Sequence, residues 1–385
     1  MAVVMEDRLG LRREVSRGSG PRMAIVHDSL VQWGGAEKVV EVLHGMFPEA
    51  PVYTSVYDPA AMPAFYREWD IRCSFMQRLP MKSHLHRAAL MLYPLAIETL
   101  DLGDYDLVIS SSSRFAKGVI TPPDAHHISY TYTPMRFAWH PDRYADGEKN
   151  PRLTKLLLQP AAHYLRTWDC VASNRVDQFI AISRAVESRI RKFYRRDSQI
   201  IYPPVETDHF TPVDDREIGN YYIVVSRFAP YKRLDLAVEA FTRLGRPLKV
   251  VGSGRQNRAL KSGAGPNVEF LGHVSSAELR SLVARSRAFI LPGEEDFCIA
   301  AVEANSAGRP VIAYAAGGAL DTQVDGLTGV LFHPQSVEGL VEAVERADAI
   351  DFDPTTIRQH ARRFDVKVFR ERMMQLVESQ VGVKS

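Results

Sequence analysis

The chain has 385 residues, of which 45% are hydrophobic and 24% are charged, and its formal net charge is +2. This length indicates two domains of ordinary globular composition, and the small net charge argues against a nucleic-acid-binding protein. Three cysteines far apart in the sequence indicate neither a disulfide framework nor a metal site, and they are typical of a reducing cytoplasm. No apolar run reaches the roughly 18 residues that a transmembrane helix needs.

Residues 1–22 are rich in Arg, Glu, Gly and Ser and lack the apolar core of a signal peptide, so we interpret them as a flexible extension. Short apolar runs and helical periodicity alternate after them. They predict strands at 23–26, 52–54, 107–109, 127–132 and 179–182, and helices at 36–47 and 150–175. Ser183 is placed to cap a helix after the strand at 179–182, which we expect to be the last strand of this half.

Two prolines, Pro203 and Pro204, and a polar stretch that continues to Asn220 interrupt this alternation and mark a linker between two domains. The pattern then restarts. It predicts strands at 221–225, 248–251, 268–271, 288–292, 310–314 and 329–332, helices at 234–244 and from about 337, and a capping box at 275–278. The sequence therefore predicts an α/β fold with two parallel sheets, at 23–205 and 206–365, and a cleft between their strand ends.

Two glutamates flank the start of a helix that follows the predicted strand at 288–292. Glu295 lies in the loop and Glu303 lies inside the helix, so both can point into one cleft at the carboxyl ends of the strands. Carboxylates there can accept hydrogen bonds from sugar or ribose hydroxyls, while the helix amides face phosphates. The spacing alone fits solvated surface acids equally well, and Glu294 and Asp296 compete for the assignment.

Two cations follow the first predicted strand of the second half, just after Ser226. Arg227 with its bidentate fork and Lys232 as a point charge can hold a diphosphate and stabilise it as a leaving group. The alternative interpretation is a solvated basic loop.

Three pairs of glycines lie directly after a predicted strand or directly before a predicted helix. They are Gly34-Gly35, Gly252 with Gly254, and Gly317-Gly318. Their backbone amides can approach phosphates closely, although each pair alone also fits a tight turn. None completes a dinucleotide fingerprint or a P-loop, and the scattered histidines form no metal motif, so we predict no metal.

Basic residues precede an apolar run within residues 78–93. This arrangement is typical of a surface that contacts anionic lipid. The alternative is an ordinary core-facing helix with a solvated start.

Together these motifs resemble the retaining glycosyltransferases of the large GT-B family 4, over nearly the whole chain from about residue 23. The resemblance rests on elements in the family's order: Gly34-Gly35-Ala36-Glu37, Ala181-Ile182-Ser183, Tyr202-Pro203-Pro204-Val205, Ser226-Arg227 with Lys232, Gly252-Ser253-Gly254, the Glu295/Glu303 motif, Gly317-Gly318 and Gly326-Leu327-Thr328-Gly329. The strings at 132–136 and 294–297 look most like bacterial mannosyltransferases of polysaccharide assembly, which use GDP-mannose and lipid-linked acceptors.

The resemblance implies a GT-B fold of two Rossmann-like domains, with an acceptor-binding domain at 23–205 and a nucleotide-sugar-binding domain at 206–365. A last helix at about 366–385 would pack back on the first domain. Glu295 would bind the donor sugar, Glu303 the ribose, and Arg227 with Lys232 the diphosphate. Further donor contacts are implied for Gly34, Gly35, Ser226, Gly252, Gly254, Phe297, Cys298, Ile299 and Ala300.

Two departures from the family pattern stand in these motifs. Tyr132 replaces a histidine that contacts the donor sugar in relatives, and its phenol can still donate one hydrogen bond, so it remains a catalytic candidate. Asp296-Phe297-Cys298 replaces the usual Gly-Phe-Gly. We expect the charge of Asp296 to lie near the phosphates and the bulk of Cys298 to crowd a tight backbone approach, so that both weaken donor binding.

The implied function is transfer of a hexose, with retention of configuration, onto a hydroxyl of a lipid-linked or oligosaccharide acceptor in cell-surface polysaccharide synthesis. Mannose from GDP-mannose is the expected donor, and no metal is expected because Arg227 and Lys232 supply the positive charge. A cytoplasmic protein, peripheral on the inner face of the plasma membrane, is the expected location. A UDP-sugar donor, a nucleotide-sugar epimerase or phosphorylase, and an inactive nucleotide-sugar-binding partner remain alternatives.

Overall fold

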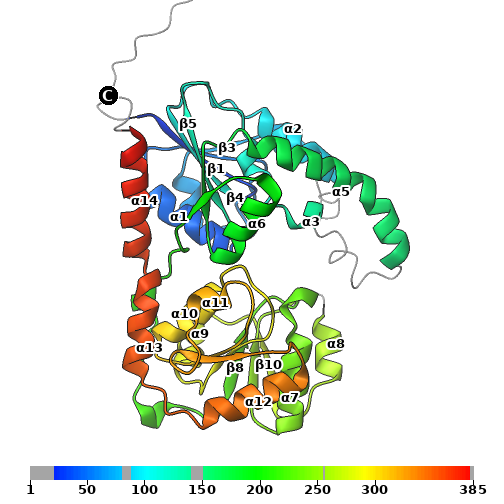
Figure 1. Cartoon of the computed structure of the whole chain (residues 1–385), viewed down its shortest axis with the longest axis vertical. Coiled ribbons are helices and arrows are strands. Elements are labelled where there is room, and N and C mark those ends of the chain that lie inside the picture. The colour runs from blue at the N-terminus through cyan, green and yellow to red at the C-terminus, as the bar shows by residue number, and fades with distance from the viewer. Residues whose placement is uncertain (1–20, 80–87, 140–150, 255, 382–385) are drawn as a thin grey trace, which may run out of the picture.

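The computed structural model describes residues 21–79, 88–139, 151–254 and 256–381. Two parallel β-sheets, one in each of two domains, organise this part of the chain (Figure 1). The first sheet has the strand order β3-β2-β1-β4-β5-β6-β7 and the second has the order β10-β9-β8-β11-β12-β13. The predicted α/β fold with two parallel-sheet domains is therefore confirmed.

The first sheet contains seven short strands. They are β1 (Met23–His27), β2 (Val52–Thr54), β3 (Ile71–Cys73), β4 (Leu107–Ser112), β5 (His126–Thr131), β6 (Gln178–Ala181) and β7 (Ser198–Ile200). The prediction that the first half ends with β6 is wrong, because β7 pairs with β6 in parallel. The sequence pattern missed β7 and β3, since both are three-residue edge strands whose side chains are not buried.

Helices cover both faces of the first sheet. They are α1 (Gly35–Met46), α2 (Tyr93–Glu98), α3 (Arg136–Trp139), α5 (Pro151–Ser173) and α6 (Arg184–Tyr194). Val39 of α1 lies in one hydrophobic cluster and Ile97 of α2 lies in another, which places these helices on opposite faces. Ser183 caps α6 by accepting a hydrogen bond from the backbone N–H of Val186, so the predicted cap is confirmed.

The second sheet contains six strands. They are β8 (Tyr222–Val225), β9 (Leu248–Val251), β10 (Val268–Gly272), β11 (Phe289–Leu291), β12 (Val311–Tyr314) and β13 (Gly329–Phe332). Its helices are α7 (Leu234–Leu244), α8 (Asn257–Ser262), α9 (Ser276–Ala284), α10 (Ile299–Ser306), α11 (Ala319–Thr322), α12 (Val337–Asp348) and α13 (Pro354–Ala361). Ser275 caps α9, as predicted, by accepting from the backbone N–H of Glu278.

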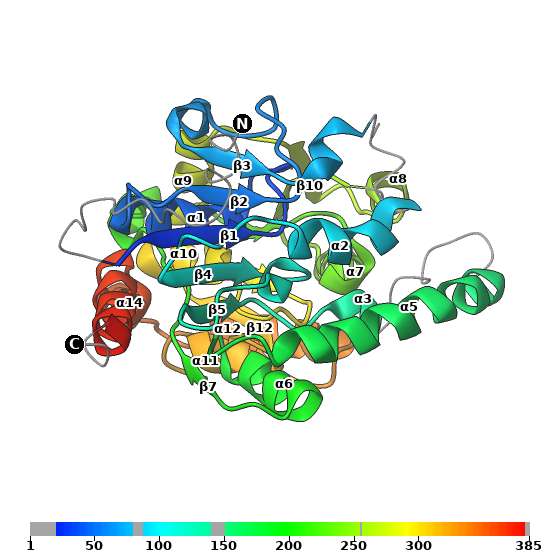
Figure 2. The ribbon, with the colours of Figure 1, turned by 90° about the horizontal axis from the view of Figure 1, so that it is seen from above.

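The chain crosses between the domains twice, and the two crossings lie side by side. Val205 accepts a backbone hydrogen bond from Val366 at 3.1 Å and donates one to Phe364 at 3.0 Å. The last helix, α14 (Val366–Val381), then runs along the first domain (Figures 1 and 2). Phe369 and Met373 of α14 belong to the core of the first domain, so the C-terminal helix is packed on the N-terminal half.

Candidate donor site

Glu295 lies in the loop between β11 and α10, at the carboxyl end of the second sheet, and is paired with Lys232. The Lys232 Nζ atom is 2.5 Å from Glu295 Oε2, and the two side chains are 14% and 16% exposed. Burial alone would lower the pKa of Lys232, but the charge and hydrogen bond of Glu295, together with the nearby Tyr231 and Cys298, outweigh it and raise that pKa above its usual value. Gly317 allows this loop to pass close by, because its φ is +60° and a Cβ there would lie 2.2 Å from the carbonyl oxygen of Glu295.

Glu303 lies inside α10 and contacts the first domain. Its Oε1 atom is 3.1 Å from Nζ of Lys38, which stands in the first turn of α1. Beside this pair, a Cβ added to Gly35 would lie 3.2 Å from Cδ1 of Ile299, the first residue of α10. The starts of α1 and α10 therefore meet across the two domains.

Arg227 is exposed and, with Ser226, lies in the loop after β8. Its guanidinium reaches Gln32 of the first domain at 3.5 Å. The structure thus places Arg227, Lys232 and Glu295 on loops after strands, and Glu303 within α10, where the two domains approach each other.

Gly252 and Gly254 lie behind the Arg227 loop. Gly252 has a φ of +122°, and a Cβ there would lie 2.0 Å from the carbonyl oxygen of Ser226. A Cβ on Gly254 would lie 2.5 Å from the carbonyl oxygen of Phe228. Both glycines therefore permit backbone segments of the protein to touch, and this contact positions the loop that carries Arg227.

Cys298 is the N-cap of α10 and has a left-handed backbone, with a φ of +69°. This conformation gives a physical reason for the glycine that the family pattern has at this position. Burial raises the pKa of the Cys298 thiol well above its usual range. Ile299 and Ala300 follow in the first helical turn, where backbone N–H groups have no acceptor within the helix.

Phe297, which the resemblance places among the donor contacts, is only 3% exposed. Its ring stacks on Tyr202, with centroids 5.8 Å apart, and meets Phe364 edge to face at 5.5 Å. It belongs to the hydrophobic cluster of the first domain although it comes from the second. The ring of Phe297 is therefore an interdomain packing element.

Asp296 was expected to bring its charge near the phosphates, and the structure shows that this charge is paired with two cations of the protein. Its carboxylate forms ion pairs with Arg136 and Arg189, both from the first domain. Burial alone would raise the pKa of Asp296, but the two guanidinium charges outweigh it and hold the pKa below its usual value. The charge of Asp296 is consequently balanced within the protein.

Tyr132 follows β5, and its hydroxyl is engaged inside the first domain. The hydroxyl donates to the backbone carbonyl of Ala36 at 3.0 Å and lies 2.8 Å from Ser111 Oγ. Burial raises the pKa of Tyr132 well above its usual value. These contacts anchor the first turn of α1, so the phenol has a structural role that its sequence position did not reveal.

Lys38, Arg136 and Arg189 are site residues that the sequence reasoning missed. Lys38 directly follows the Gly34-to-Glu37 string, and Arg136 ends the string at 132–136, so both lay beside recognised motifs. Arg189 lies within the helix that Ser183 caps, where an arginine is indistinguishable from an ordinary surface residue.

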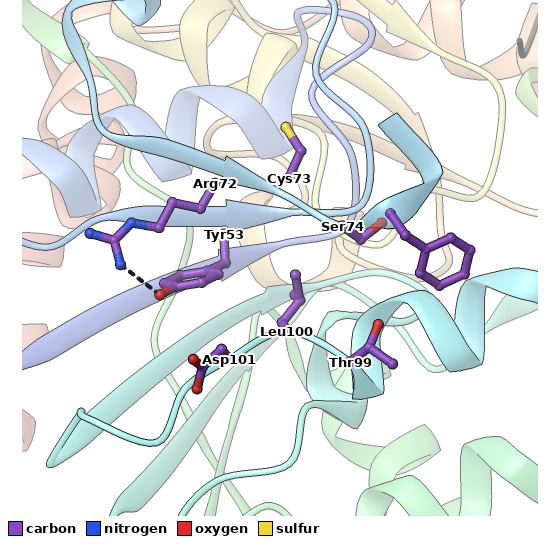
Figure 3. A pocket seen from close by; sticks show the side chains of 8 residues that line it. Tyr53, Arg72, Cys73, Ser74, Thr99, Leu100 and Asp101 are labelled. Atoms are coloured by element: carbon purple, nitrogen blue, oxygen red, sulfur yellow. Dashed lines mark hydrogen bonds between the residues drawn. The ribbon is translucent and has the colours of Figure 1, made fainter. Parts of the chain in front are cut away.

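A pocket of about 490 Å³ lies elsewhere, at the edge of the first sheet (Figure 3). Tyr53, Arg72 and Leu100 are among its lining residues, and Arg72 donates a hydrogen bond to the Tyr53 hydroxyl at 2.9 Å. None of the predicted donor residues lines it. Across the described ranges, no cluster of His, Cys, Asp and Glu could hold a metal ion, and no helix has the length and apolarity to cross a membrane.

Comparison with known families matches the two domains in turn. A family model described as Glycosyltransferase Family 4 matches residues 33–209, and one described as Glycosyl transferases group 1 matches residues 207–363. The chain belongs to the GT-B glycosyltransferases of family 4. The junction between the two matches falls at the first crossing between the domains.

Individual relatives of this family-4 chain are distant. A glycogen synthase of Mycobacterium tuberculosis is 32% identical over 151 residues, which is 36% of each chain. A GDP-mannose-dependent α-(1-6)-phosphatidylinositol monomannoside mannosyltransferase of Mycolicibacterium smegmatis is 29% identical over 201 residues, covering 44% of this chain and 53% of the relative. The matches span 36–53% of the length of the curated relatives.

The solved structure of Anabaena HepE in complex with UDP has the same fold. Its TM-score is 0.67 at 17% identity, and the superposition covers 93% of this chain and 100% of HepE.

Proposed function

We propose that this protein transfers a sugar from a nucleotide-diphosphate donor to a hydroxyl group, with retention of configuration. The observation that carries the proposal is the largely buried Lys232–Glu295 pair, which lies beside Arg227 and the start of α10 where the two domains meet. Positive charge for a leaving diphosphate and a carboxylate for sugar hydroxyls then lie within one loop cluster. Family membership supports the same reaction class.

Each group has a role in this proposal. Arg227 and Lys232 bind the diphosphate and stabilise it as it leaves, which supplies electrostatically what a metal would otherwise supply. Glu295 accepts hydrogen bonds from the donor sugar, and Glu303 accepts them from the ribose. A diphosphate oxygen takes the proton of the attacking hydroxyl on the face from which the diphosphate leaves. The first domain excludes water when it closes.

GDP-mannose is the proposed donor. The strings at 132–136 and 294–297 support it, as does the likeness to the mycobacterial mannosyltransferase. The solved structure of HepE, which is in complex with UDP, has the same fold. A UDP-sugar is therefore the competing candidate for the donor.

A lipid-linked or oligosaccharide acceptor in cell-surface polysaccharide synthesis is the proposed second substrate, reached from the inner face of the membrane. Residues 80–87 of the 78–93 segment lie outside the described residues. Next to them, Leu92 and Leu95 are exposed at the start of α2, whereas Ala96 and Ile97 of the same helix are buried in the core. This exposed apolar edge supports a peripheral contact with lipid.

Liposome co-sedimentation tests the lipid contact. Leu92→Ser with Leu95→Ser is expected to weaken binding to anionic vesicles, while Leu320→Ser, an equally exposed leucine of the second domain, is expected to leave it unchanged. Equal binding by all variants removes the support for this contact.

Donor binding and turnover test the reaction. Calorimetric titration with GDP-mannose, UDP-glucose, UDP-N-acetylglucosamine and GDP-fucose identifies the donor, and NMR of the product reports its anomeric configuration. Glu295→Gln is expected to lower turnover at least about a hundredfold if the carboxylate acts mainly in the transition state. Glu338→Gln, at an exposed carboxylate of α12, is the matched control.

Several outcomes contradict the proposal. Near-normal turnover of Glu295→Gln removes its assigned role. Sugar interconversion without an acceptor indicates an epimerase, and a requirement for free phosphate indicates a phosphorylase. Tight donor binding without hydrolysis or transfer to any acceptor indicates an inactive nucleotide-sugar-binding partner.

A further inference from the structure

Successive side chains of the loop at 294–296 contact opposite domains. Glu295 forms an ion pair with Lys232 of its own domain, whereas Glu294 and Asp296 form ion pairs with arginines of the first domain. This alternation follows from an extended backbone, in which neighbouring side chains point to opposite sides, and Glu295 indeed forms an isolated parallel bridge with Gly317. The first domain therefore binds the loop through the two residues that flank Glu295.

Two arginines of the first domain form these ion pairs. Arg189 of α6 reaches Asp296 with one guanidinium nitrogen and Glu294 with another, the latter at 3.0 Å. Arg136, the first residue of α3, also pairs with Asp296, and its guanidinium lies 5.4 Å from the ring centroid of Tyr231. Arg136 thus contacts both the Glu295 loop and the residue before Lys232.

The carboxylate at the centre of this cluster is largely buried. Two guanidinium groups face two carboxylates, and the Asp296 side chain is only 11% exposed, so solvent and salt screen its contacts weakly. Both arginines belong to the first domain and both carboxylates belong to the second. The contacts consequently exist only when the two domains are together.

We propose that Arg136 and Arg189 are positioning residues that order the Glu295 loop on domain closure, by binding Asp296 and Glu294. The proposal rests on the proposed function, because it makes the placement of Glu295 against the donor sugar depend on closure. Donor bound to an open enzyme then meets a less ordered loop, which limits cleavage before the acceptor domain has arrived.

Removal of Asp296 gives the largest expected effect. In Asp296→Asn, Arg136 and Arg189 keep their charges but lose the carboxylate that both of them bind, so like-charge repulsion opposes closure. Arg189→Met removes a cation and breaks two ion pairs, but Arg136 remains to balance Asp296. Arg184→Met is the matched control, because Arg184 begins the same helix and forms a separate interdomain ion pair with Asp321 at 2.8 Å.

Hydrogen exchange of the backbone at 294–297 measures the order of the loop directly, and steady-state kinetics with GDP-mannose measure its consequence. We expect Asp296→Asn to speed exchange there and to lower kcat by about tenfold or more, within the usual range of coupling between sites. The affinity for GDP, measured by calorimetry, is expected to change by less than about threefold, because the diphosphate contacts are assigned to Arg227 and Lys232. Arg189→Met is expected to act in the same direction and less strongly.

Three results overturn the proposal: wild-type exchange in Asp296→Asn, faster exchange with unchanged kcat, or equal effects from Arg184→Met. If Asp296→Asn fails to fold, Arg189→Met carries the same test. A wild-type protein that transfers no sugar refutes the proposed function instead, and the exchange measurement still decides whether the arginines order the loop.

Discussion

Gly35→Ala is the most direct test of how closely the two domains approach. The added Cβ would lie 3.2 Å from Cδ1 of Ile299, shorter than the roughly 3.5–4.0 Å of an ordinary carbon contact. The Ile299 methyl group must move by a few tenths of an ångström, so the cost is at the lower end of the overpacking range, about 1 kcal/mol or roughly fivefold in an equilibrium. The clash exists only in the closed arrangement, because Gly35 and Ile299 belong to different domains.

The same substitution has an opposite effect on the helix itself. Gly35 is the first residue of α1, so alanine there stabilises the helix by less than the roughly 0.5–1 kcal/mol of a mid-helix glycine, whether the domains are open or closed. Gly35→Ala is therefore expected to leave the thermal stability nearly unchanged, while it lowers turnover and increases the radius of gyration measured by small-angle scattering.

Gly45→Ala is the matched control on the same helix, α1. Its added Cβ would meet no atom nearer than a guanidinium nitrogen of Arg370 at 3.8 Å, so it is expected to raise stability slightly and leave closure unchanged. Wild-type scattering and turnover in Gly35→Ala would refute the close approach of α1 and α10.

Three further predictions concern stability and are measured by urea unfolding. Burial lowers the pKa of His127 to about 4, so the unfolded chain protonates at this residue before the folded chain does. Stability is therefore lost as pH falls from about 6.5 to about 4, by up to roughly 3 kcal/mol, and His127→Gln is expected to flatten this slope. Lys117→Met leaves the buried Asp169 carboxylate without its cation and is expected to cost about 3–5 kcal/mol, with partial recovery in Lys117→Met/Asp169→Asn. Cys298→Gly is expected to lie within about 1 kcal/mol of the wild type, whereas Cys298→Val should cost more than about 2 kcal/mol because a branched side chain opposes a positive φ.

Each of these predictions has a clear contrary result. An unchanged pH slope in His127→Gln removes the assigned titration. Equal losses in the single and double variants at Lys117 and Asp169 show that the charge pairing is not the cause. Equal stability of the two Cys298 variants contradicts the left-handed backbone at that position.

Much of the fold could be predicted because its central strands are buried on both faces. Residues 222–225 and 311–314 are apolar runs of this kind, and the interior strands β8 and β12 lie within the predicted bounds. Local chemistry also located helix starts, since the Ser183 and Ser275 hydroxyls bind amides only three residues away. The short edge strands β3 and β7 carry no such run, and their pairing depends on neighbours that are distant in sequence.

The sequence by itself determined where the chemistry-bearing residues stand in the chain: Glu295 in a strand-end loop, Glu303 in the following helix, and Arg227 with Lys232 after the first strand of the second half. Only the tertiary structure decided which charges meet. Arg136 and Arg189 are 160 and 107 residues from Asp296, yet they neutralise it. The physical reason is that secondary structure follows from local spacing and burial, whereas an ion pair depends on distance in space. That distance is set here by two sheets whose loops come together at the domain interface.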